Sequence, residues 1–145
     1  MIYRESSQLL KQLAKGFPII TVTGPRQSGK STLVKEVFPE KEYVSFENSA
    51  IRRQAEKDPQ DFLTQFRNGA IIDEVQRIPD IFSYLQVLVD EKKEVGLFIL
   101  TGSNQFEYMQ NLTQSLAGRT AILKLLPFSY SEIYGENKIT INFGI

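Results

Sequence analysis

Short apolar segments alternate along the chain with longer stretches whose apolar residues recur at helical spacing. The apolar segments are residues 19–22, 43–46, 70–72, 97–100 and 121–126. They are almost continuously hydrophobic, which is typical of strands covered on both faces in a parallel sheet. The alternation of strands and helices predicts an α/β protein with a layered architecture.

Two of the helical stretches have recognisable boundaries or faces. Asp58 is typical of a helix N-cap, Pro59 suits the first helical position, and Asn68-Gly69 is expected to end the helix. Spacing of i, i+3, i+4, i+7 and i+8 predicts a single buried face on the next helix, formed by Ile81, Tyr84, Leu85, Leu88 and Val89.

Composition narrows the chemistry that the chain can perform. With 145 residues, 41% hydrophobic and 23% charged, residues 1–145 are expected to form one domain. Basic and acidic residues number 17 each, so net charge does not favour nucleic acid, although a local basic patch stays open. Cysteine and histidine are both absent, which excludes disulfides, thiolate or imidazole zinc sites and histidine-based triads. A metal ion would need oxygen ligands.

The sequence contains no apolar run of about 18 residues, and its first 16 residues lack the apolar stretch of a signal peptide. We therefore expect a cytoplasmic, soluble protein without membrane contacts.

Residues 24–31 match the phosphate-loop pattern G-x-x-x-x-G-K-[ST] between an expected strand and an expected helix. The glycines let backbone N–H groups point inward, and the helix N-terminus adds partial positive charge, so the loop can hold a polyphosphate. The expected phosphate-binding residues are Gly24, Pro25, Arg26, Gln27, Ser28, Gly29, Lys30, Ser31 and Thr32.

Three of these residues have specific expected roles. Lys30 would reach the β- and γ-phosphates, the Ser31 hydroxyl would hold Mg²⁺, and Thr32 is placed to touch the α-phosphate. Arg26 either contacts phosphate or lies along the outer edge of the loop.

An acidic pair follows the third apolar segment. Asp73 is placed to hold Mg²⁺ through its water shell, while Glu74 would accept a proton from an attacking water. Ser103 and Asn104 follow the fourth segment, where polar groups could bind the γ-phosphate or the water. Alternatively, these two residues form a turn and a helix cap.

Four motifs in order resemble one known family. "TGPRQSGKSTL", "AIIDEVQRIP", "FILTGSNQF" and "LAGRTAILKLLPFSYSE" look like the AAA-type ATPase domain of a prokaryotic P-loop family. The resemblance implies a three-layer P-loop NTPase fold with a five-stranded parallel sheet in the order 5-1-4-3-2. It also implies ATP and Mg²⁺ as ligands of Lys30, Ser31, Asp73 and Glu74.

Members of that family carry a further C-terminal domain of unknown function. We interpret the chain as the ATPase domain and leave open that it belongs to a longer protein or a homo-oligomer. Arg119, in "LAGR", is either an arginine that stabilises the γ-phosphate in the transition state or a salt-bridge anchor of the fifth strand.

Three functions remain open at this stage. The first is an ATPase that drives or times a conformational change in an attached partner. The second is a nucleotide-dependent binding module with little turnover, because arginine fingers and lids commonly come from elsewhere. The third, a DNA-associated ATPase, follows only from the broad class of fold, since Lys and Arg form no obvious stripe.

Overall fold

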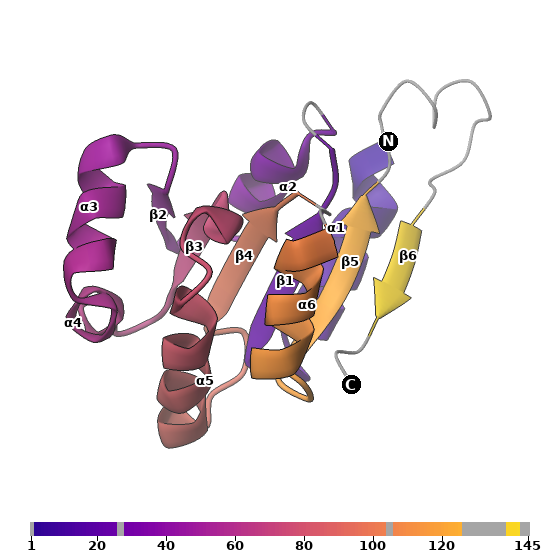
Figure 1. Ribbon diagram of the computed structural model, residues 1–145. Helices are drawn as coiled ribbons and strands as arrows, with labels where there is room; N and C mark the ends of the chain where they lie inside the picture. Colours follow the sequence, from indigo (N-terminus) through magenta and orange to yellow (C-terminus); the bar gives the residue numbers. More distant parts are fainter. Residues whose placement is uncertain (1, 26–27, 104–105, 126–138, 143–145) are drawn as a thin grey trace.

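The computed structural model, which describes residues 2–25, 28–103, 106–125 and 139–142, contains one six-stranded sheet with helices on both faces (Figure 1). The strands are β1 (Ile19–Thr23), β2 (Glu42–Ser45), β3 (Ala70–Asp73), β4 (Phe98–Gly102), β5 (Thr120–Leu125) and β6 (Ile139–Asn142). The helices are α1 (Ile2–Leu13), α2 (Lys30–Val37), α3 (Ser49–Lys57), α4 (Pro59–Thr64), α5 (Ile81–Lys92) and α6 (Phe106–Ser115), with a short 3₁₀ turn, η1 (Val75–Arg77).

The sheet order is β2-β3-β4-β1-β5-β6. The first five strands are parallel, which confirms the predicted α/β sheet and its strand order. Strand β6 was not predicted; it pairs antiparallel with β5 and lies at the edge of the sheet. Its Ile-Thr-Ile-Asn alternation covers only four residues, too few to separate a strand from a loop by periodicity alone.

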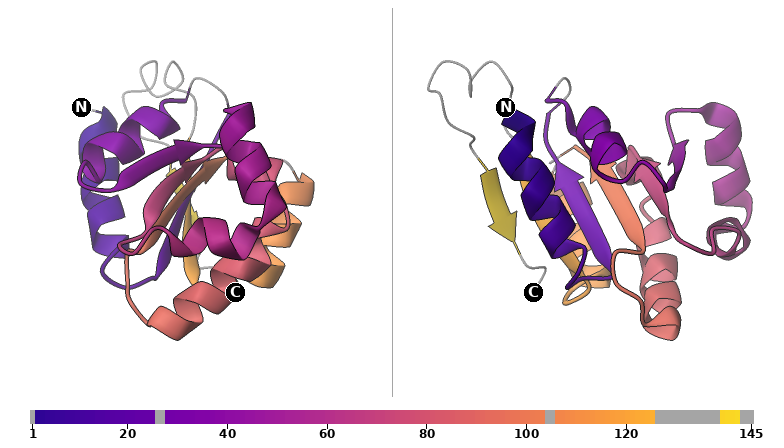
Figure 2. Two further views of the ribbon diagram at one scale, coloured as in Figure 1. Left: turned by 90° about the vertical axis from the view of Figure 1, so that its left-hand side faces the viewer. Right: turned by 180° about the vertical axis from the view of Figure 1, so that it is seen from behind.

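Alternate residues of each central strand belong to two separate hydrophobic cores, one on each face of the sheet. Helices cover both faces (Figure 2). On one face, Ile20 and Val22 of β1 belong to the same cluster as Leu33 and Val34 of α2. On the other, Ile19 belongs to the cluster that contains buried residues of α3, α4, α5 and α6. This two-sided burial explains the nearly continuous apolar strands.

The predicted helix boundaries are largely observed. The Asp58 carboxylate accepts a hydrogen bond of 3.1 Å from the Asp61 N–H, and Pro59 is the first residue of α4. The helix ends at Thr64, before the predicted Asn68-Gly69 stop. The chain then reaches Gly69 through a turn in which the Gly69 N–H bonds the Phe66 carbonyl.

The predicted buried face of α5 was wrong at one position. Tyr84 is 39% exposed, whereas Phe82 is fully buried together with Ile81 and Leu85. Helix α5 contacts both α4 and α6, and its covered face is shifted around the helix from Tyr84 toward Phe82.

Within the described residues, no helix is both long and apolar enough to cross a bilayer.

Gly69 marks a close approach between the segments that lead into β3 and β4. It has φ 76°, and a Cβ atom there would lie 1.5 Å from the Leu97 carbonyl oxygen. Gly118 has nearly the same φ, 77°, but a Cβ there would meet nothing within 4 Å. Comparing a substitution at Gly69 with one at Gly118 therefore separates the cost of backbone strain from the cost of steric overlap.

We expect Gly118→Ala to lower the free energy of unfolding by about 1–2 kcal/mol, the cost of a left-handed non-glycine residue. Gly69→Ala should cost at least about 2 kcal/mol more, because the Leu97 backbone must move as well. Urea denaturation of both variants measures the difference. Equal losses would contradict the close contact at Gly69.

Candidate functional site

The loop after β1 and the acidic pair after β3 lie at the same carboxyl-terminal edge of the sheet. Thr23 pairs with Gly102 in the parallel register, and the Gly24 N–H donates to the Gly102 carbonyl at 3.2 Å. Strand β3 pairs with β4 in parallel, so it ends at this edge too. Ligands of open α/β sheets bind outside this edge.

Both glycines of the motif are required by the backbone. Gly29 has φ 85° and precedes the first residue of α2, a left-handed conformation that glycine adopts without strain. At Gly24, a Cβ atom would lie 2.6 Å from the Leu125 carbonyl oxygen. The loop can therefore lie directly against the end of β5 only because residue 24 has no side chain.

Lys30 crosses back over the loop. Its side chain is only 6% exposed, and Nζ donates a hydrogen bond of 3.3 Å to the Pro25 carbonyl. Thr32, in the first turn of α2, is exposed. Arg26 and Gln27 lie outside the described residues, so the structure does not bear on their predicted phosphate contacts.

Asp73 is the centre of a cluster of hydroxyl groups. The Ser31 hydroxyl lies 3.0 Å from Oδ1 and 2.9 Å from Oδ2, and donates to this carboxylate. Tyr43 Oη donates to Oδ2 at 2.5 Å, and the Thr101 hydroxyl donates to Oδ1. Asp73 is 6% exposed, so these donors replace the water that a buried carboxylate loses.

Glu74 has an unusual backbone that the same cluster supports. Its φ of 56° and ψ of 48° are in the left-handed region, where a non-glycine residue is disfavoured. Its N–H donates to the Thr101 hydroxyl at 3.2 Å, while its Oε1 accepts a hydrogen bond of 2.7 Å from the Gln76 amide. Thr101 thus connects both members of the acidic pair. Backbone strain of this kind is concentrated at functional sites.

Several hydroxyl groups lack partners near this edge. The Oγ atoms of Ser28 and Ser103 and the Oγ1 atom of Thr23 are buried and have no hydrogen-bond partner among the described residues. An unsatisfied buried polar atom costs about 1–3 kcal/mol, so such atoms often mark a place where a ligand binds. Asn104 lies outside the described part of the chain, and its predicted role stays a prediction.

Two residues of the cluster, Tyr43 and Thr101, were missed by the sequence analysis. Tyr43 pairs with Ile71 and Ser45 pairs with Asp73 in the β2–β3 register. Residues two apart on a strand share a face, so Tyr43 lies on the face of Asp73, one pair away. The sequence analysis would have identified Tyr43 if the register between β2 and β3 had been known.

The environment keeps Tyr43 in its protonated form. Burial, together with the hydrogen bond to Asp73, raises the pKa of the Tyr43 hydroxyl above its usual value. The Lys35 ammonium lies over the Tyr43 ring, 4.0 Å from its centroid, and this cation–π contact helps to hold the ring in place. At neutral pH the phenol is therefore a hydrogen-bond donor to the carboxylate.

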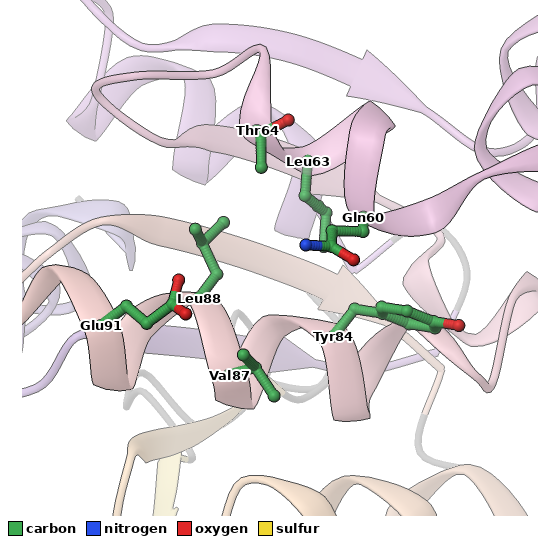
Figure 3. A pocket seen from close by; sticks show the side chains of 7 residues that line it. All are labelled: Gln60, Leu63, Thr64, Tyr84, Val87, Leu88 and Glu91. Carbon is green, nitrogen blue, oxygen red and sulfur yellow. The ribbon is translucent and has the colours of Figure 1, made fainter.

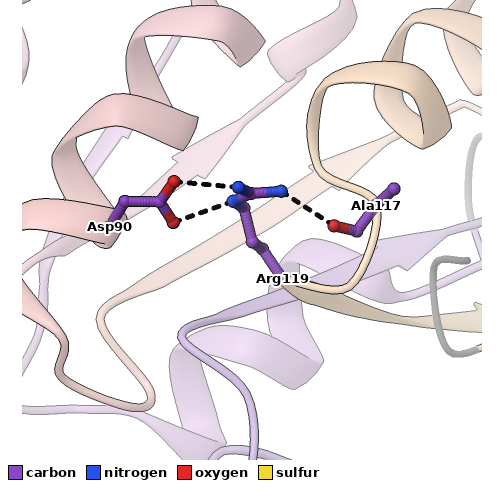
Figure 4. A network of polar contacts seen from close by, with 3 residues as sticks. All are labelled: Asp90, Ala117 and Arg119. Carbon is purple, nitrogen blue, oxygen red and sulfur yellow. Dashed lines mark hydrogen bonds and ion pairs between the residues drawn. The ribbon is translucent and has the colours of Figure 1, made fainter.

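Arg119 lies far from these residues, at the amino-terminal edge of the sheet. Its carbonyl accepts from the N–H of Ile19, the first residue of β1. Its guanidinium bonds both Asp90 carboxylate oxygens at 2.8 Å and the Ala117 carbonyl at 2.9 Å (Figure 4). This pair lowers the pKa of Asp90. The position agrees with the salt-bridge alternative and does not support a role at the γ-phosphate of the same chain.

An apolar pocket of about 170 Å³ lies between α4 and α5, away from the phosphate loop (Figure 3). None of the residues that line it is a predicted site residue. They are Gln60, Leu63, Thr64, Tyr84, Val87, Leu88 and Glu91.

The residues present fit a hard divalent cation such as Mg²⁺. The Ser31 hydroxyl and the Asp73 carboxylate both offer oxygen ligands for a cation, and their oxygens lie within 3.0 Å of each other. Among the described residues, no group of three or more acidic, histidine or cysteine side chains could hold a metal ion alone. An ion here would therefore also need phosphate oxygens and water, which is the usual coordination of Mg²⁺ in nucleotide sites.

Comparison with known proteins agrees with this geometry. A family model described as an AAA domain matches residues 16–134, and the chain belongs to this family of AAA-type P-loop ATPases. Uncharacterised proteins of Mycobacterium bovis and Mycobacterium tuberculosis are each 32% identical to it over 123 residues. The match covers 84% of this chain but only 28% of each relative. The chain thus spans less than a third of their length.

Thr101 is the residue whose loss should disturb the acidic pair most directly. In Thr101→Val the Glu74 N–H loses its acceptor and Asp73 loses a donor. We expect the free energy of unfolding to fall by about 1–3 kcal/mol, the cost of leaving buried polar groups unsatisfied.

Thr21→Val is the matched control. Thr21 is also fully buried, and among the described residues its hydroxyl bonds only that of Thr120, which also donates to the Ala121 carbonyl. The control should lose less than about 1 kcal/mol, because no group is left without a partner. Chemical denaturation compares the two, and equal losses would contradict the linking role of Thr101.

Proposed function

We propose that the protein binds ATP with Mg²⁺ and hydrolyses the bond between its β- and γ-phosphates. The observation that carries this proposal is the hydrogen bond from the Ser31 hydroxyl, which lies within bonding distance of both Asp73 carboxylate oxygens and joins the phosphate loop to the acidic strand end. A loop of this sequence binds phosphate, and a carboxylate beside its hydroxyl completes a magnesium site. Membership of the AAA domain family supports the nucleotide-binding part.

The chemistry assigned to each residue follows from its place. The N–H groups of the loop and the Lys30 ammonium hold the negative phosphate oxygens. Ser31 and Asp73 would hold Mg²⁺, which would supply positive charge to neutralise these oxygens. Glu74 takes a proton from the attacking water. At the same time, the water oxygen bonds to the γ-phosphorus, and the bond between the γ-phosphorus and the β,γ-bridging oxygen breaks. Ser103, whose hydroxyl is without a partner among the described residues, donates to the γ-phosphate or the water.

A second candidate is a nucleotide-dependent binding module with little turnover. Two observations favour it for this chain alone: Arg119 is paired with Asp90 at the opposite edge, and the Glu74 carboxylate is engaged by Gln76. A transition-state arginine would then come from another subunit or domain. In that case a homo-oligomer or an attached C-terminal region completes the site, and hydrolysis by the isolated chain is slow.

Variants of two site residues separate the proposals. Lys30→Ala should weaken ATP binding, measured by calorimetry, because the phosphates lose their ammonium partner. Glu74→Gln should keep ATP binding but reduce phosphate release about 10²–10⁴-fold, the usual contribution of a general base. Lys57→Ala and Glu56→Gln, both on exposed side chains of α3, are the charge-matched controls.

If wild type and Glu74→Gln both bind ATP and release phosphate equally slowly, the binding module is favoured over the ATPase. If Lys30→Ala binds ATP as tightly as the wild type, neither proposal survives.

A further inference from the structure

Strand β2 brings an aromatic hydroxyl to the metal side of the site. Tyr43 is 38% exposed, yet its Oη atom bonds the buried Asp73 carboxylate. Its ring lies beneath the Lys35 ammonium of α2, so the side chain is fixed at both its ring and its hydroxyl. Tyr43 is not one of the buried residues of the two hydrophobic cores.

The three donors to Asp73 divide between its two oxygens. Thr101 donates to Oδ1, Tyr43 donates to Oδ2, and Ser31 lies within bonding distance of both. Thr101 and Tyr43 therefore fix the rotation of the carboxylate plane from the two neighbouring strands, β4 and β2. Without the Tyr43 hydroxyl, Ser31 is the one donor left to Oδ2 among the described residues.

Ser31 is the donor whose geometry a metal ion would alter. A hydroxyl has one hydrogen and two lone pairs, so Ser31 can bind a cation through its oxygen while still donating to Asp73. It can then no longer be shared freely between both carboxylate oxygens. When Ser31 donates to Oδ1 in that state, Tyr43 is the donor that holds Oδ2 among the described residues, while Thr101 holds Oδ1.

We propose that Tyr43 is a positioning residue for the magnesium site, which orients Asp73 through its hydroxyl and is itself held by Lys35. The inference rests on the proposed function, because it concerns the Mg²⁺ that accompanies the nucleotide. Hydrogen bonds from such outer residues fix the orientation of metal-binding carboxylates, and their loss typically lowers metal affinity about 10–100-fold.

The test compares Tyr43→Phe with Tyr84→Phe. Both changes remove one phenol oxygen and keep the ring, and the two tyrosines are 38% and 39% exposed. Tyr84 lies on α5 and lines the apolar pocket (Figure 3), whose lining does not include Asp73. Thermal unfolding of each variant shows that the fold is kept.

Mn²⁺ serves as the probe, because electron paramagnetic resonance counts bound ions without any turnover. In the presence of saturating ADP, Tyr43→Phe should need at least about tenfold more Mn²⁺ for half-saturation than the wild type. Tyr84→Phe should match the wild type. ADP affinity in excess EDTA should be the same in all three proteins, because Tyr43 acts through the metal and not on the phosphates.

The outcomes distinguish this inference from the function on which it rests. If the wild type binds Mn²⁺ with ADP and Tyr43→Phe has the same half-saturation as Tyr84→Phe, the positioning role is wrong and the proposed function stands. If Tyr43→Phe weakens ADP binding in EDTA by the same factor as in the presence of Mn²⁺, Tyr43 acts on the nucleotide and the inference is also wrong. If the wild type binds no ADP, both proposals fail together.

Discussion

The buried carboxylate of Asp73 is the point at which four elements of the site are connected. It belongs to β3 and accepts hydrogen bonds from Ser31 of α2, Tyr43 of β2 and Thr101 of β4. A charge that is nearly excluded from water is stable only if its oxygens are satisfied, so these elements must keep their relative positions. The parallel register of β2, β3 and β4 supplies that constraint.

The two edges of the sheet manage their polar groups in opposite ways. At the amino-terminal edge, Arg119 and Asp90 form a bidentate pair in which both charged groups are satisfied. At the carboxyl-terminal edge, the hydroxyls of Ser28 and Ser103 are buried without partners among the described residues. A bound ligand can satisfy polar groups that the fold leaves without a partner. Chemistry is therefore expected at one edge and structural support at the other.

Strand β2 has a larger part in this arrangement than its burial suggests. It is a terminal strand of the sheet, and its residues are exposed or half-buried, in contrast to the fully buried β1, β3 and β4. Its parallel pairing nevertheless places Tyr43 against the central carboxylate. Helix α2, which follows the phosphate loop, therefore contacts the cluster around Asp73 at two points. Ser31 bonds Asp73 itself, and Lys35 covers the Tyr43 ring.

The sequence alone determined the features that depend on local pattern. Continuous apolar runs predict strands covered on both sides, Asp58-Pro59 predicts the start of α4, and the Gly24–Ser31 pattern identifies the phosphate loop with its strand and helix. These signals arise within a few residues, so no tertiary contact is needed to read them. Strand β6 escaped because four alternating residues carry too little periodicity.

Only the tertiary structure decided which polar side chains meet. Tyr43 and Asp73 are 30 residues apart and Thr101 follows 28 residues later, so their contact depends on strand register. These strands are parallel and are joined by long crossovers, so no tight turn in the sequence fixes their alignment. The pairing of Arg119 with Asp90, rather than a position beside the phosphate loop, follows likewise from the end of the strand at which Arg119 lies. Tyr84 was misassigned to the core because the direction in which a helix faces the core is set by its neighbours, here the helices α4 and α6. Local chemistry thus names the groups, and long-range packing decides which of them act together.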